Sequence, residues 1–442
     1  MTSNYPLRQR DILWFWLPLF ASWLLMTAEG PIVSAAINRL PNEVIMLAAQ
    51  GIVVSLSVTI ESPIINMLAT ATALVRDRQS FAMVRRFTIH WMIGLTLVTV
   101  VVAFTPLFDL LVVRLLGTPE EIAVWVRPGM QIMTLWSAAI AWRRFLQGVM
   151  IHFNQTQKVA WGTAVRLFTS GGVVIGLSIW GQWAGVINGT IALMLGVIAE
   201  AIYATITVRP ILQNELAQAP PQDTPLTYRE LFWFHLPLAA TSLLVLLAQP
   251  MVTFSLARLD QPTQSLAAWP VLFQVMLMAR AAALALPEAV IALTKGDDTV
   301  APVRLFSRNL SIVLTGLMML FIFTPLSGFY LFVVQDMEQN VGALAQNAMA
   351  LFILFPALAV ATSWLRGLLI HKRATTAVNG GMAINLGVTA VILAIGLAAK
   401  WPGLPTAAIA LNVASLAEII FLGWRTQHII PIAMPALQPK SL

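Results

Sequence analysis

The chain has 442 residues, of which 58% are hydrophobic and only 10% are charged, and its mean hydropathy is +0.80. Soluble globular proteins carry about 25% charged residues, so a folded chain of this composition could not cover its surface with polar groups. The composition excludes a soluble enzyme, a disordered chain and a DNA-binding domain, and it predicts an all-α polytopic membrane protein. The net charge of +7 then predicts a one-sided distribution of basic residues, not a nucleic-acid partner.

Twelve stretches have the roughly 20 apolar residues that a transmembrane helix needs. They cover residues 12–36, 44–75, 87–108, 122–143, 159–181, 183–208, 231–257, 265–294, 306–326, 342–365, 374–398 and 405–424. The first stretch is too long for the apolar part of a signal peptide, so we expect it to be retained. Prolines inside several stretches predict kinks or broken turns.

Basic residues divide unequally between the two sides of this topology. Nineteen of the 26 Lys and Arg residues fall on the side of the N-terminus, five fall on the other side, and Arg166 and Arg280 lie inside predicted spans. The excess of basic residues marks the cytoplasmic side of a membrane protein. The sequence therefore predicts that both termini are cytoplasmic.

The two halves of the chain match each other at a constant offset of 219 residues. Matching segments include Leu17-Pro18-Leu19 with Leu236-Pro237-Leu238, Arg39-Leu40 with Arg258-Leu259, Phe104-Thr105-Pro106-Leu107 with Phe323-Thr324-Pro325-Leu326, and Gly148 with Gly367. A register held this long indicates a duplication. Because each half has six spans, the halves are parallel repeats. We expect an N-terminal lobe (residues 1–208), a cytoplasmic linker (209–230) and a C-terminal lobe (231–442).

The arrangement of motifs within each half narrows the fold further. Each half starts with Leu-Pro-Leu, followed by a short loop with Arg-Leu and a long second span with a central proline. Later in each half, a polar turn follows Arg144-x3-Gly148 or Arg366-Gly367. This pattern resembles the MATE-type transporters and lipid flippases of the multidrug/oligosaccharidyl-lipid/polysaccharide exporter superfamily.

Within that superfamily the chain is similar to the progressive ankylosis protein family. The similar segments are residues 43–51, Ser62-Pro63, residues 76–78, Phe232-Trp233, Gln249-Pro250 and Arg258. The resemblance implies a MATE-like fold and the efflux of a small polyanion such as pyrophosphate or citrate. The chain departs from the family around Arg280 and lacks the acidic tail of its animal members.

Charged residues inside the hydrocarbon are costly, so those that remain are candidates for function. Glu61 and Arg280 lie near the middle of the second and eighth spans and are related by the repeat offset. We expect them to face each other across a central cleft, either as a substrate or gating pair in which Arg280 binds an anion, or as a permanent ion pair between the lobes. Gln50 and Ser57 share a helical face with Glu61 and are expected to line the same cleft.

Glu29 precedes Gly30-Pro31 deep in the first span. A carboxylate beside a broken helix is a common cation or proton site in transporters. Glu29 is therefore a candidate coupling-ion residue together with Glu61, and the alternative is a carboxylate that only accepts hydrogen bonds at the kink.

Two further charged positions are assigned a structural and a gating role. Arg166 and Glu200 lie at equal depth in adjacent spans and are expected to form a structural ion pair, repeated in the second half as a hydrogen bond between Asn385 and Glu418. Glu288 follows Pro287 near the cytoplasmic end of the eighth span and is a possible gate residue.

Catalytic and metal-binding signatures are absent from the sequence. There is no cysteine, no histidine spacing typical of a metal site, and no phosphate-binding G-x-x-x-x-G-K-[ST] loop. We therefore expect no enzymatic activity, no cofactor and no metal.

The sequence thus predicts a secondary transporter that exports a small organic or phosphate-type anion by alternating access. The first alternative is a proton- or sodium-coupled multidrug exporter, and the second is a flippase for a lipid-linked precursor. We expect a monomer in a bacterial inner membrane, with a small-molecule substrate and no nucleic-acid partner. A scaffold or receptor without transport would leave Glu61 and Arg280 without a role.

Overall fold

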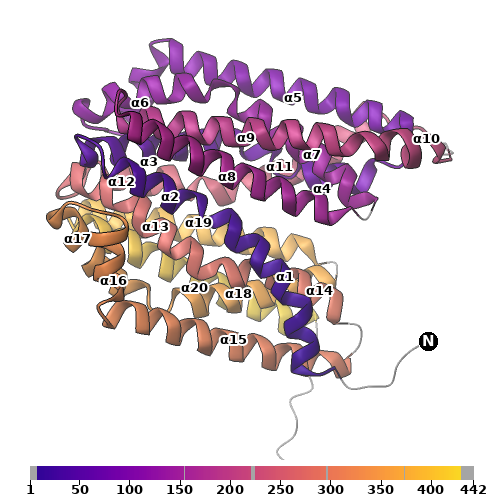
Figure 1. Ribbon diagram of the computed structural model, residues 1–442. Coiled ribbons are helices and arrows are strands. Elements are labelled where there is room, and N and C mark those ends of the chain that lie inside the picture. The colour runs from indigo at the N-terminus through magenta and orange to yellow at the C-terminus, as the bar shows by residue number, and fades with distance from the viewer. Residues whose placement is uncertain (1–6, 154, 221–223, 295–296, 373, 430–442) are drawn as a thin grey trace, which may run out of the picture.

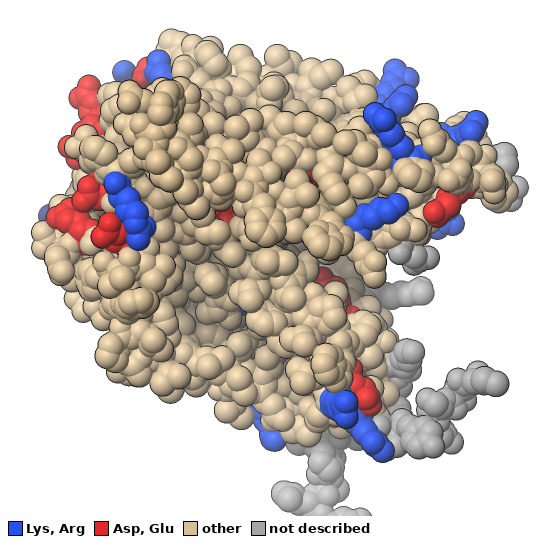
Figure 2. All heavy atoms as spheres, in the orientation of Figure 1, with Lys and Arg blue, Asp and Glu red and all other residues tan. Residues whose placement is uncertain are grey.

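The computed structural model describes residues 7–153, 155–220, 224–294, 297–372 and 374–429, and all regular structure within these ranges is helical. Ten helical segments are long and apolar enough to cross a membrane, and a bent pair of helices raises this number to eleven. Charged side chains gather at the two ends of the molecule and leave an apolar band between them (Figure 2). The expected all-α polytopic membrane protein is confirmed.

The N-terminal half contains the following helices. They are α1 (Gln9–Thr27), α2 (Glu29–Ile37), α3 (Glu43–Glu61), η1 (Ser62–Ile64), α4 (Met67–Leu74), α5 (Arg78–Phe104), η2 (Asp109–Leu115), α6 (Glu120–Ile132), η3 (Met133–Leu135), α7 (Trp136–His152), α8 (Thr156–Trp180), α9 (Gly185–Pro210), η4 (Ile211–Glu215) and α10 (Leu216–Gln218). The last helical stretch thus continues to Gln218, well into the expected linker; residues 221–223 of that linker lie outside the described residues.

The C-terminal half repeats the same order of helices. They are α11 (Tyr228–Leu246), α12 (Ala248–Leu256), α13 (Pro262–Leu284), α14 (Leu286–Leu293), α15 (Asp297–Phe323), α16 (Leu326–Phe329), η5 (Tyr330–Val334), α17 (Gln339–Met349), η6 (Ala350–Phe352), α18 (Phe355–His371), α19 (Thr375–Ala398) and α20 (Gly403–Ile429). Helices α17 and α18 form the bent pair, with an angle of 47° between them. Helices α6 and α7 hold the equivalent place in the N-terminal half, at the predicted span 122–143.

Breaks in the helices occur where the prolines predict them. The first span breaks at Ala28, just before Gly30-Pro31, and the second breaks at the short helix η1, which contains Pro63. The eighth span breaks at Ala285, and Pro287 lies in the first turn of α14. Proline lacks the backbone N–H and clashes with the preceding turn, which explains each break.

Figure 1 shows the two halves stacked, with α2 to α10 in the upper lobe and α12 to α20 in the lower lobe. We call these the N lobe and the C lobe. The end that carries the α2–α3 and α12–α13 loops is called the outer end, and the opposite end is called the inner end, after the topology that the charges predict. The lobes diverge toward the inner end (Figure 1).

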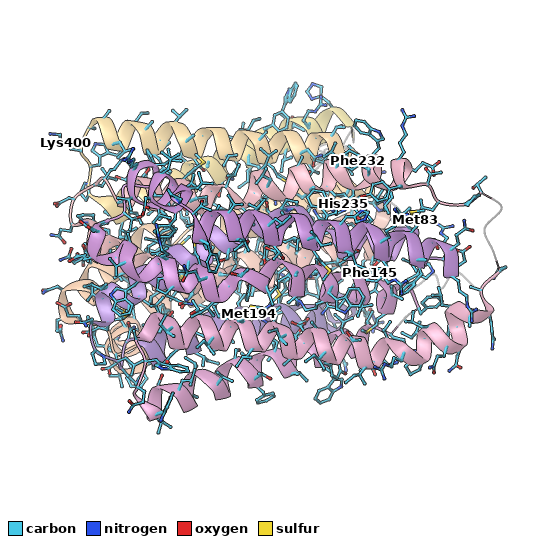
Figure 3. The ribbon with its side chains drawn as sticks, turned by 90° about the horizontal axis from the view of Figure 1, so that it is seen from above. Met83, Phe145, Met194, Phe232, His235 and Lys400 are labelled. Atoms are coloured by element: carbon cyan, nitrogen blue, oxygen red, sulfur yellow. The ribbon has the colours of Figure 1, made fainter. Side chains whose placement is uncertain are left out.

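Helices α1 and α11 are exchanged between the lobes. Helix α1 packs on α13, α14 and α15 of the C lobe as well as on α8, and the indole of Trp16 donates to the carbonyl of Ala282 at 3.0 Å. Helix α11 packs on η1 and α5 of the N lobe, where His235 Nε2 lies 2.9 Å from the carbonyl of Pro63 (Figure 3). Trp16 and His235, like Pro63 and Ala282, are related by the repeat offset. The exchange is therefore reciprocal.

The outer end is closed by a second reciprocal exchange. Nη2 of Arg39, at the end of α2, donates to the carbonyls of Val333 and Val334 at 3.1 and 3.0 Å. Its repeat mate Arg258 donates to the carbonyls of Arg114 and Leu115 at 3.2 and 2.5 Å. Each guanidinium thus binds the last carbonyls of a π-helix in the opposite lobe, which lack intrahelical partners and carry negative partial charge.

A buried tyrosine supports the same closure in the C lobe. Burial raises the pKa of Tyr330 to about 12, so its hydroxyl stays neutral and accepts from Nε2 of Gln335 at 3.0 Å. Nε2 of Gln335 also donates to the carbonyl of Pro31 at 3.2 Å, and the backbone carbonyl of Gln335 accepts from the side-chain amide of Asn38 at 2.8 Å. Gln335 therefore joins η5 to α2 in the N lobe.

The repeat axis passes between α3 and α13 at mid-membrane. Gly51 and Pro270 are repeat mates, and a Cβ on Gly51 would lie 2.4 Å from Cγ of Pro270. Two equivalent positions can touch each other only near the axis that relates them. Glycine is required here because the two backbones approach closely, as is common between membrane helices.

We predict that Gly148→Ala lowers the thermal stability of the protein in detergent. A Cβ at this position would lie 2.4 Å from the backbone carbonyl of Leu68, so α4 and α7 would have to separate, at a cost of about 1–3 kcal/mol. Gly94→Ala on α5 is the matched control, because a Cβ there meets nothing within 4 Å and alanine favours the helix. Tryptophan fluorescence during heating measures both; equal unfolding temperatures would contradict the packing described here.

Candidate functional site

The interior of the N lobe is organised around a fully buried carboxylate on α9. Oε1 of Glu200 accepts hydrogen bonds from Nη1 of Arg143 and from Nε2 of Gln147, both at 2.9 Å. The side chains of Arg143 and Glu200 are 5% and 0% exposed. Because a buried charge is stable only when it is paired and hydrogen-bonded, these three residues form one structural unit.

The expected ion pair between Arg166 and Glu200 is wrong. Arg166 instead binds both carboxylate oxygens of Glu29, with Nε to Oε1 at 3.0 Å and a second contact from Nη2 to Oε2. The reason is that α8 packs beside the α1–α2 break as well as beside α9, while α7 supplies the guanidinium that Glu200 needs. The bidentate geometry is the strongest form of an arginine–carboxylate contact.

The C lobe contains the equivalent of the Glu200 unit. Oε1 of Glu418 on α20 accepts from Nε of Arg366 at 2.7 Å, and Oε2 accepts from the amide of Asn385 at 3.0 Å. The expected hydrogen bond between Asn385 and Glu418 is therefore confirmed. The ion pair with Arg366 adds a partner that the sequence did not indicate.

The arginine that pairs with the buried carboxylate lies one helical turn later in the C lobe than in the N lobe. Arg366 is the repeat mate of Gln147, and the repeat mate of Arg143 is Thr362. Residues four apart lie on the same face of a helix, so an arginine at either position reaches the same carboxylate. The carboxylate on the last helix of each lobe has thus kept an arginine partner although the position of that arginine differs.

Glu61 and Arg280 form no ion pair with each other in the described part of the chain. The charges that act most strongly on Glu61 are Arg143, Arg166 and Arg144 of its own lobe, whereas those acting on Arg280 are Arg366 and Glu418 of the C lobe. The repeat explains this result, since equivalent positions near the ends of α3 and α13 turn toward the interior of their own lobes.

The polar face of α3 also turns into the N lobe. The Gln50 side chain lies against Gly189 of α9, where a Cβ would come within 3.0 Å of Oε1. Both amide atoms of Gln50, the hydroxyl of Ser57 and Oε2 of Glu61 are buried without a hydrogen-bond partner. Gln50, Ser57 and Glu61 thus share a face of α3, as expected. The expectation that this face lines a central cleft is wrong for Gln50, because the residue that α3 presents to the other lobe is Gly51.

Arg280 is the interior arginine of the C lobe that has no acidic partner. No carboxylate of the described residues lies within ion-pair distance of it, and its Nε is buried without a hydrogen-bond partner. The guanidinium lies 5.8 Å from the ring of Phe355 on α18, and the residue as a whole remains half-buried. Arg280 is therefore a positive charge at the edge of the C-lobe interior that can reach a ligand.

Glu288 lies in the first turn of α14 and is exposed. This position is compatible with contact to solvent or to lipid head groups at the inner end. Its assignment as a gate residue stays a prediction.

Three interior arginines were placed outside the membrane by the sequence. The nineteen basic residues that the sequence places on the side of the N-terminus include Arg143, Arg144 and Arg366, but α7 continues to His152 and α18 to His371. The repeat contained the signal for this extension, because His152 and His371 are repeat mates and end equivalent helices. Hydropathy alone stopped both spans at the first arginine.

The interior of the two lobes consequently differs in charge. Three carboxylates (Glu29, Glu61, Glu200) and three arginines (Arg143, Arg144, Arg166) occupy the N lobe. The C-lobe interior has Glu418 with Arg280 and Arg366, and therefore a net positive charge. Among the described residues, no group of three His, Asp or Glu side chains could hold a metal ion.

We predict that Arg143→Gln strongly destabilises the protein. The substitution leaves the Glu200 carboxylate buried without its cation, and breaking a buried ion pair costs about 3–5 kcal/mol. The unfolding temperature in detergent measures the effect. The double variant Arg143→Gln with Glu200→Gln removes the uncompensated charge and should recover part of the loss. A single variant that unfolds like the wild type would show that Gln147 alone satisfies Glu200.

Comparisons with known proteins bear on the fold. The chain matches no protein-family profile and no curated protein. Solved structures do match. A multidrug resistance MATE family transporter of the MOP superfamily, in an inward-facing conformation, has a TM-score of 0.71 and 13% identity over 93% of this chain and 96% of that one.

Two further similar structures carry other functions. The lipid II flippase MurJ, in an inward closed conformation, has a TM-score of 0.67 and 13% identity over 93% of this chain and 87% of the other. A MOP superfamily transporter from Pyrococcus furiosus, described as having a binding pocket of reverse polarity, has a TM-score of 0.65 and 12% identity, covering 95% and 96% of the two chains. The chain therefore has the MATE-like fold, as the sequence resemblance implied.

Proposed function

We propose that this protein is a secondary transporter that exports a small organic or phosphate-type anion by alternating access between two lobes. The fold supports transport, because the structures that share it are described as transporters and a flippase. The observation that carries the choice of an anion is the unpaired guanidinium of Arg280 in the C lobe.

The physical argument starts from the cost of a charge inside the bilayer. An arginine at mid-membrane costs at least about 3 kcal/mol unless a partner or water compensates it, and residues of this kind mark substrate pathways. Arg143, Arg166 and Arg366 have carboxylate partners within the protein. Arg280 has none among the described residues, so an anion from solution is the partner that would complete its environment.

The chemistry of the guanidinium fits carboxylates and phosphates in particular. Its planar fork of N–H donors binds two oxygens of one group, and it stays charged at all physiological pH values. The aromatic ring of Phe355 lies 5.8 Å from the guanidinium, and an apolar neighbour lowers the local dielectric constant and so strengthens an electrostatic contact. Pyrophosphate and citrate, the substrates that the resemblance to the progressive ankylosis family implies, both present such oxygens.

The proton- or sodium-coupled multidrug exporter remains the second candidate, because the N lobe holds three carboxylates. Its weakness is that both oxygens of Glu29 already bind Arg166. A cation at Glu29 would have to displace a bidentate guanidinium. Glu61, whose Oε2 lacks a partner, is the better coupling residue of the two.

A flippase for a lipid-linked precursor is the third candidate. It gains support from Arg143, Arg144 and Arg366, which lie in the interior although the sequence predicts them outside the membrane. Arg144 also has a buried Nε without a partner, so a guanidinium donor is available in the N lobe as well as in the C lobe. We place the protein in a bacterial inner membrane as a monomer with both termini cytoplasmic, in line with the charge asymmetry.

We predict that Arg280→Gln lowers the efflux of citrate and pyrophosphate from proteoliposomes by at least about tenfold, because one charge-assisted contact to the anion is lost. Arg308→Gln is the matched control, since Arg308 is an exposed arginine on α15. Its flux should equal that of the wild type.

A cationic dye and Glu61→Gln distinguish the alternatives in the same assay. Dye efflux that survives Arg280→Gln but is lost in Glu61→Gln would favour the multidrug exporter. Anion flux that is unchanged in Arg280→Gln would refute the anion site. Flux of neither solute by the wild type, together with scrambling of a fluorescent lipid, would favour the flippase.

A further inference from the structure

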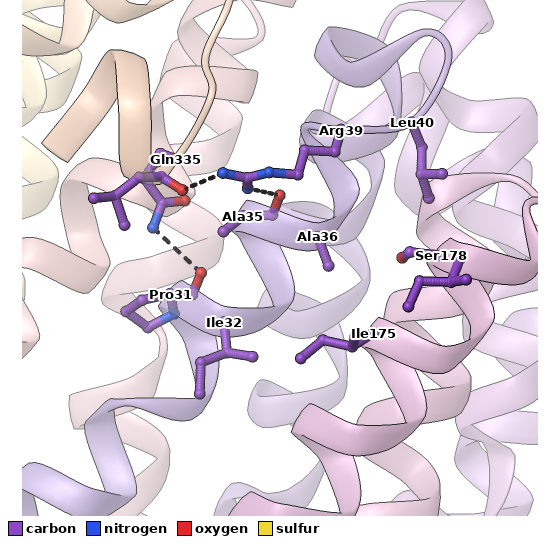
Figure 4. A pocket seen from close by; sticks show the side chains of 11 residues that line it. Pro31, Ile32, Ala35, Ala36, Arg39, Leu40, Ile175, Ser178 and Gln335 are labelled. Carbon is purple, nitrogen blue, oxygen red and sulfur yellow. Dashed lines mark hydrogen bonds between the residues drawn. The ribbon is translucent and has the colours of Figure 1, made fainter. Parts of the chain in front are cut away.

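A cavity of about 550 Å³ lies at the outer end, between α2 and α8 of the N lobe and the end of η5 in the C lobe (Figure 4). Its walls are almost entirely apolar, and the main contributors are Pro31, Ile32, Ala35 and Ile179. The polar groups that reach it come from Arg39, Ser178 and Gln335. None of these residues has a role in the transport site proposed above.

The cavity opens toward the bilayer and not toward water. Ile175 and Ile179, which form its α8 wall, are 51% and 82% exposed on the apolar band of the molecule. Just beyond them, Trp180 and Trp183 are exposed at the end of α8. Tryptophans in this position mark the level of the lipid head groups. The cavity therefore lies within the hydrocarbon of the bilayer half at the outer end, immediately below its head groups.

An apolar cavity that is open to hydrocarbon takes up hydrocarbon. Water would lose hydrogen bonds on entering it, and an empty cavity would lose dispersion contacts along its whole wall. The volume falls within the range of about 300–1,000 Å³ that is typical of pockets for small organic molecules. An acyl chain is the molecule of matching chemistry that surrounds this part of the protein.

The polar end of the cavity selects the kind of lipid. Arg39 is exposed and has no carboxylate within ion-pair distance among the described residues. Its bonds to the carbonyls of Ala35, Val333 and Val334 use Nη1 and Nη2 and leave its net charge and its Nε free. The Ser178 hydroxyl is buried without a hydrogen-bond partner and points into the cavity (Figure 4). A cationic fork and a free hydroxyl donor above an apolar slot match a phosphate ester with its attached chain.

We propose that this cavity binds one anionic phospholipid, with an acyl chain between α2 and α8 and the phosphate at Arg39. Both lobes contribute to the site, because Val334 and Gln335 of the C lobe close it against α2. Separation of the lobes at the outer end would divide the site. The lipid therefore binds the outward-closed conformation and shifts the equilibrium toward it.

The repeat provides a matched control for the test. Arg258 makes the same kind of contact between the lobes as Arg39, so Arg258→Gln weakens the outer closure without touching the cavity. Arg39→Gln removes the phosphate contact, and Ala35→Phe fills the cavity while leaving the Arg39 side chain in place. Since the chain has no cysteine, Glu120→Cys and Gln339→Cys can carry spin labels at repeat-related, exposed sites on the two lobes.

The experiment has two measurements on the full chain. Native mass spectrometry compares retention of phosphatidylglycerol and phosphatidylcholine, and spin-label distances in nanodiscs report the closed fraction at the outer end. We expect Arg258→Gln to retain less phosphatidylglycerol than the wild type only in proportion to its lower closed fraction. We expect Arg39→Gln and Ala35→Phe to retain about tenfold less than Arg258→Gln, because they lose the site itself. Phosphatidylglycerol should increase the closed fraction in the wild type and in Arg258→Gln only.

Three outcomes would overturn the proposal. Equal retention of phosphatidylglycerol by Arg39→Gln and wild type would refute the phosphate contact at Arg39. Equal retention by Ala35→Phe and wild type would refute the acyl-chain site between α2 and α8. An increase of the closed fraction by glycerol phosphate alone, without a chain, would show that only the anion matters. Unfolding temperatures of Arg39→Gln and Ala35→Phe that equal that of Arg258→Gln would separate loss of the site from a general loss of folding.

Discussion

A buried carboxylate on the last helix of each lobe organises the interior of this protein. Glu200 and Glu418 are inaccessible to water, so each must bind a guanidinium from a neighbouring helix. This requirement fixes how α7 packs on α9 and how α18 packs on α20. It also explains why the arginine could move by one helical turn between the lobes, from position 143 to the position of Arg366, without loss of the pair. The carboxylate requires a nearby arginine, and an arginine on either of two adjacent turns of the neighbouring helix meets this requirement.

The duplication determines how the lobes hold each other. At the inner end, Trp16 and His235 each bind a carbonyl beside the break in the other lobe's second span, and at the outer end Arg39 and Arg258 each bind the last carbonyls of the opposite π-helix. Helix breaks supply these free carbonyls, which hydrocarbon cannot satisfy. The breaks that interrupt the spans therefore create the contacts at the inner end, and the ends of the π-helices create those at the outer end. In the proposed alternating-access mechanism, opening toward the outer end requires release of this outer pair.

The two lobes use the same scaffold for different charges. Position 61 of the N lobe is a carboxylate that lies among arginines, and its repeat mate Arg280 is an arginine with no acidic partner in the described part of the chain. A symmetric framework with asymmetric interior charge lets the N lobe balance its own charges while the C lobe keeps a net positive charge. The proposed transport site and the proposed lipid site are separate: the first depends on Arg280 in the C lobe, and the second depends on Arg39 and the wall of α8.

The sequence by itself determined the membrane class, the duplication and the places where helices break, because hydrophobicity, a constant offset and proline act locally along the chain. It also identified Glu29, Glu61, Arg166, Glu200 and Arg280 as interior charges. Only the tertiary structure decided their partners. Arg166 binds Glu29 instead of Glu200, and Glu61 and Arg280 turn into their own lobes, because pairing depends on which helix faces which. Arg143 and Arg366 were missed for a related reason: a paired guanidinium is stable inside the membrane, and hydropathy measures the residue without its partner.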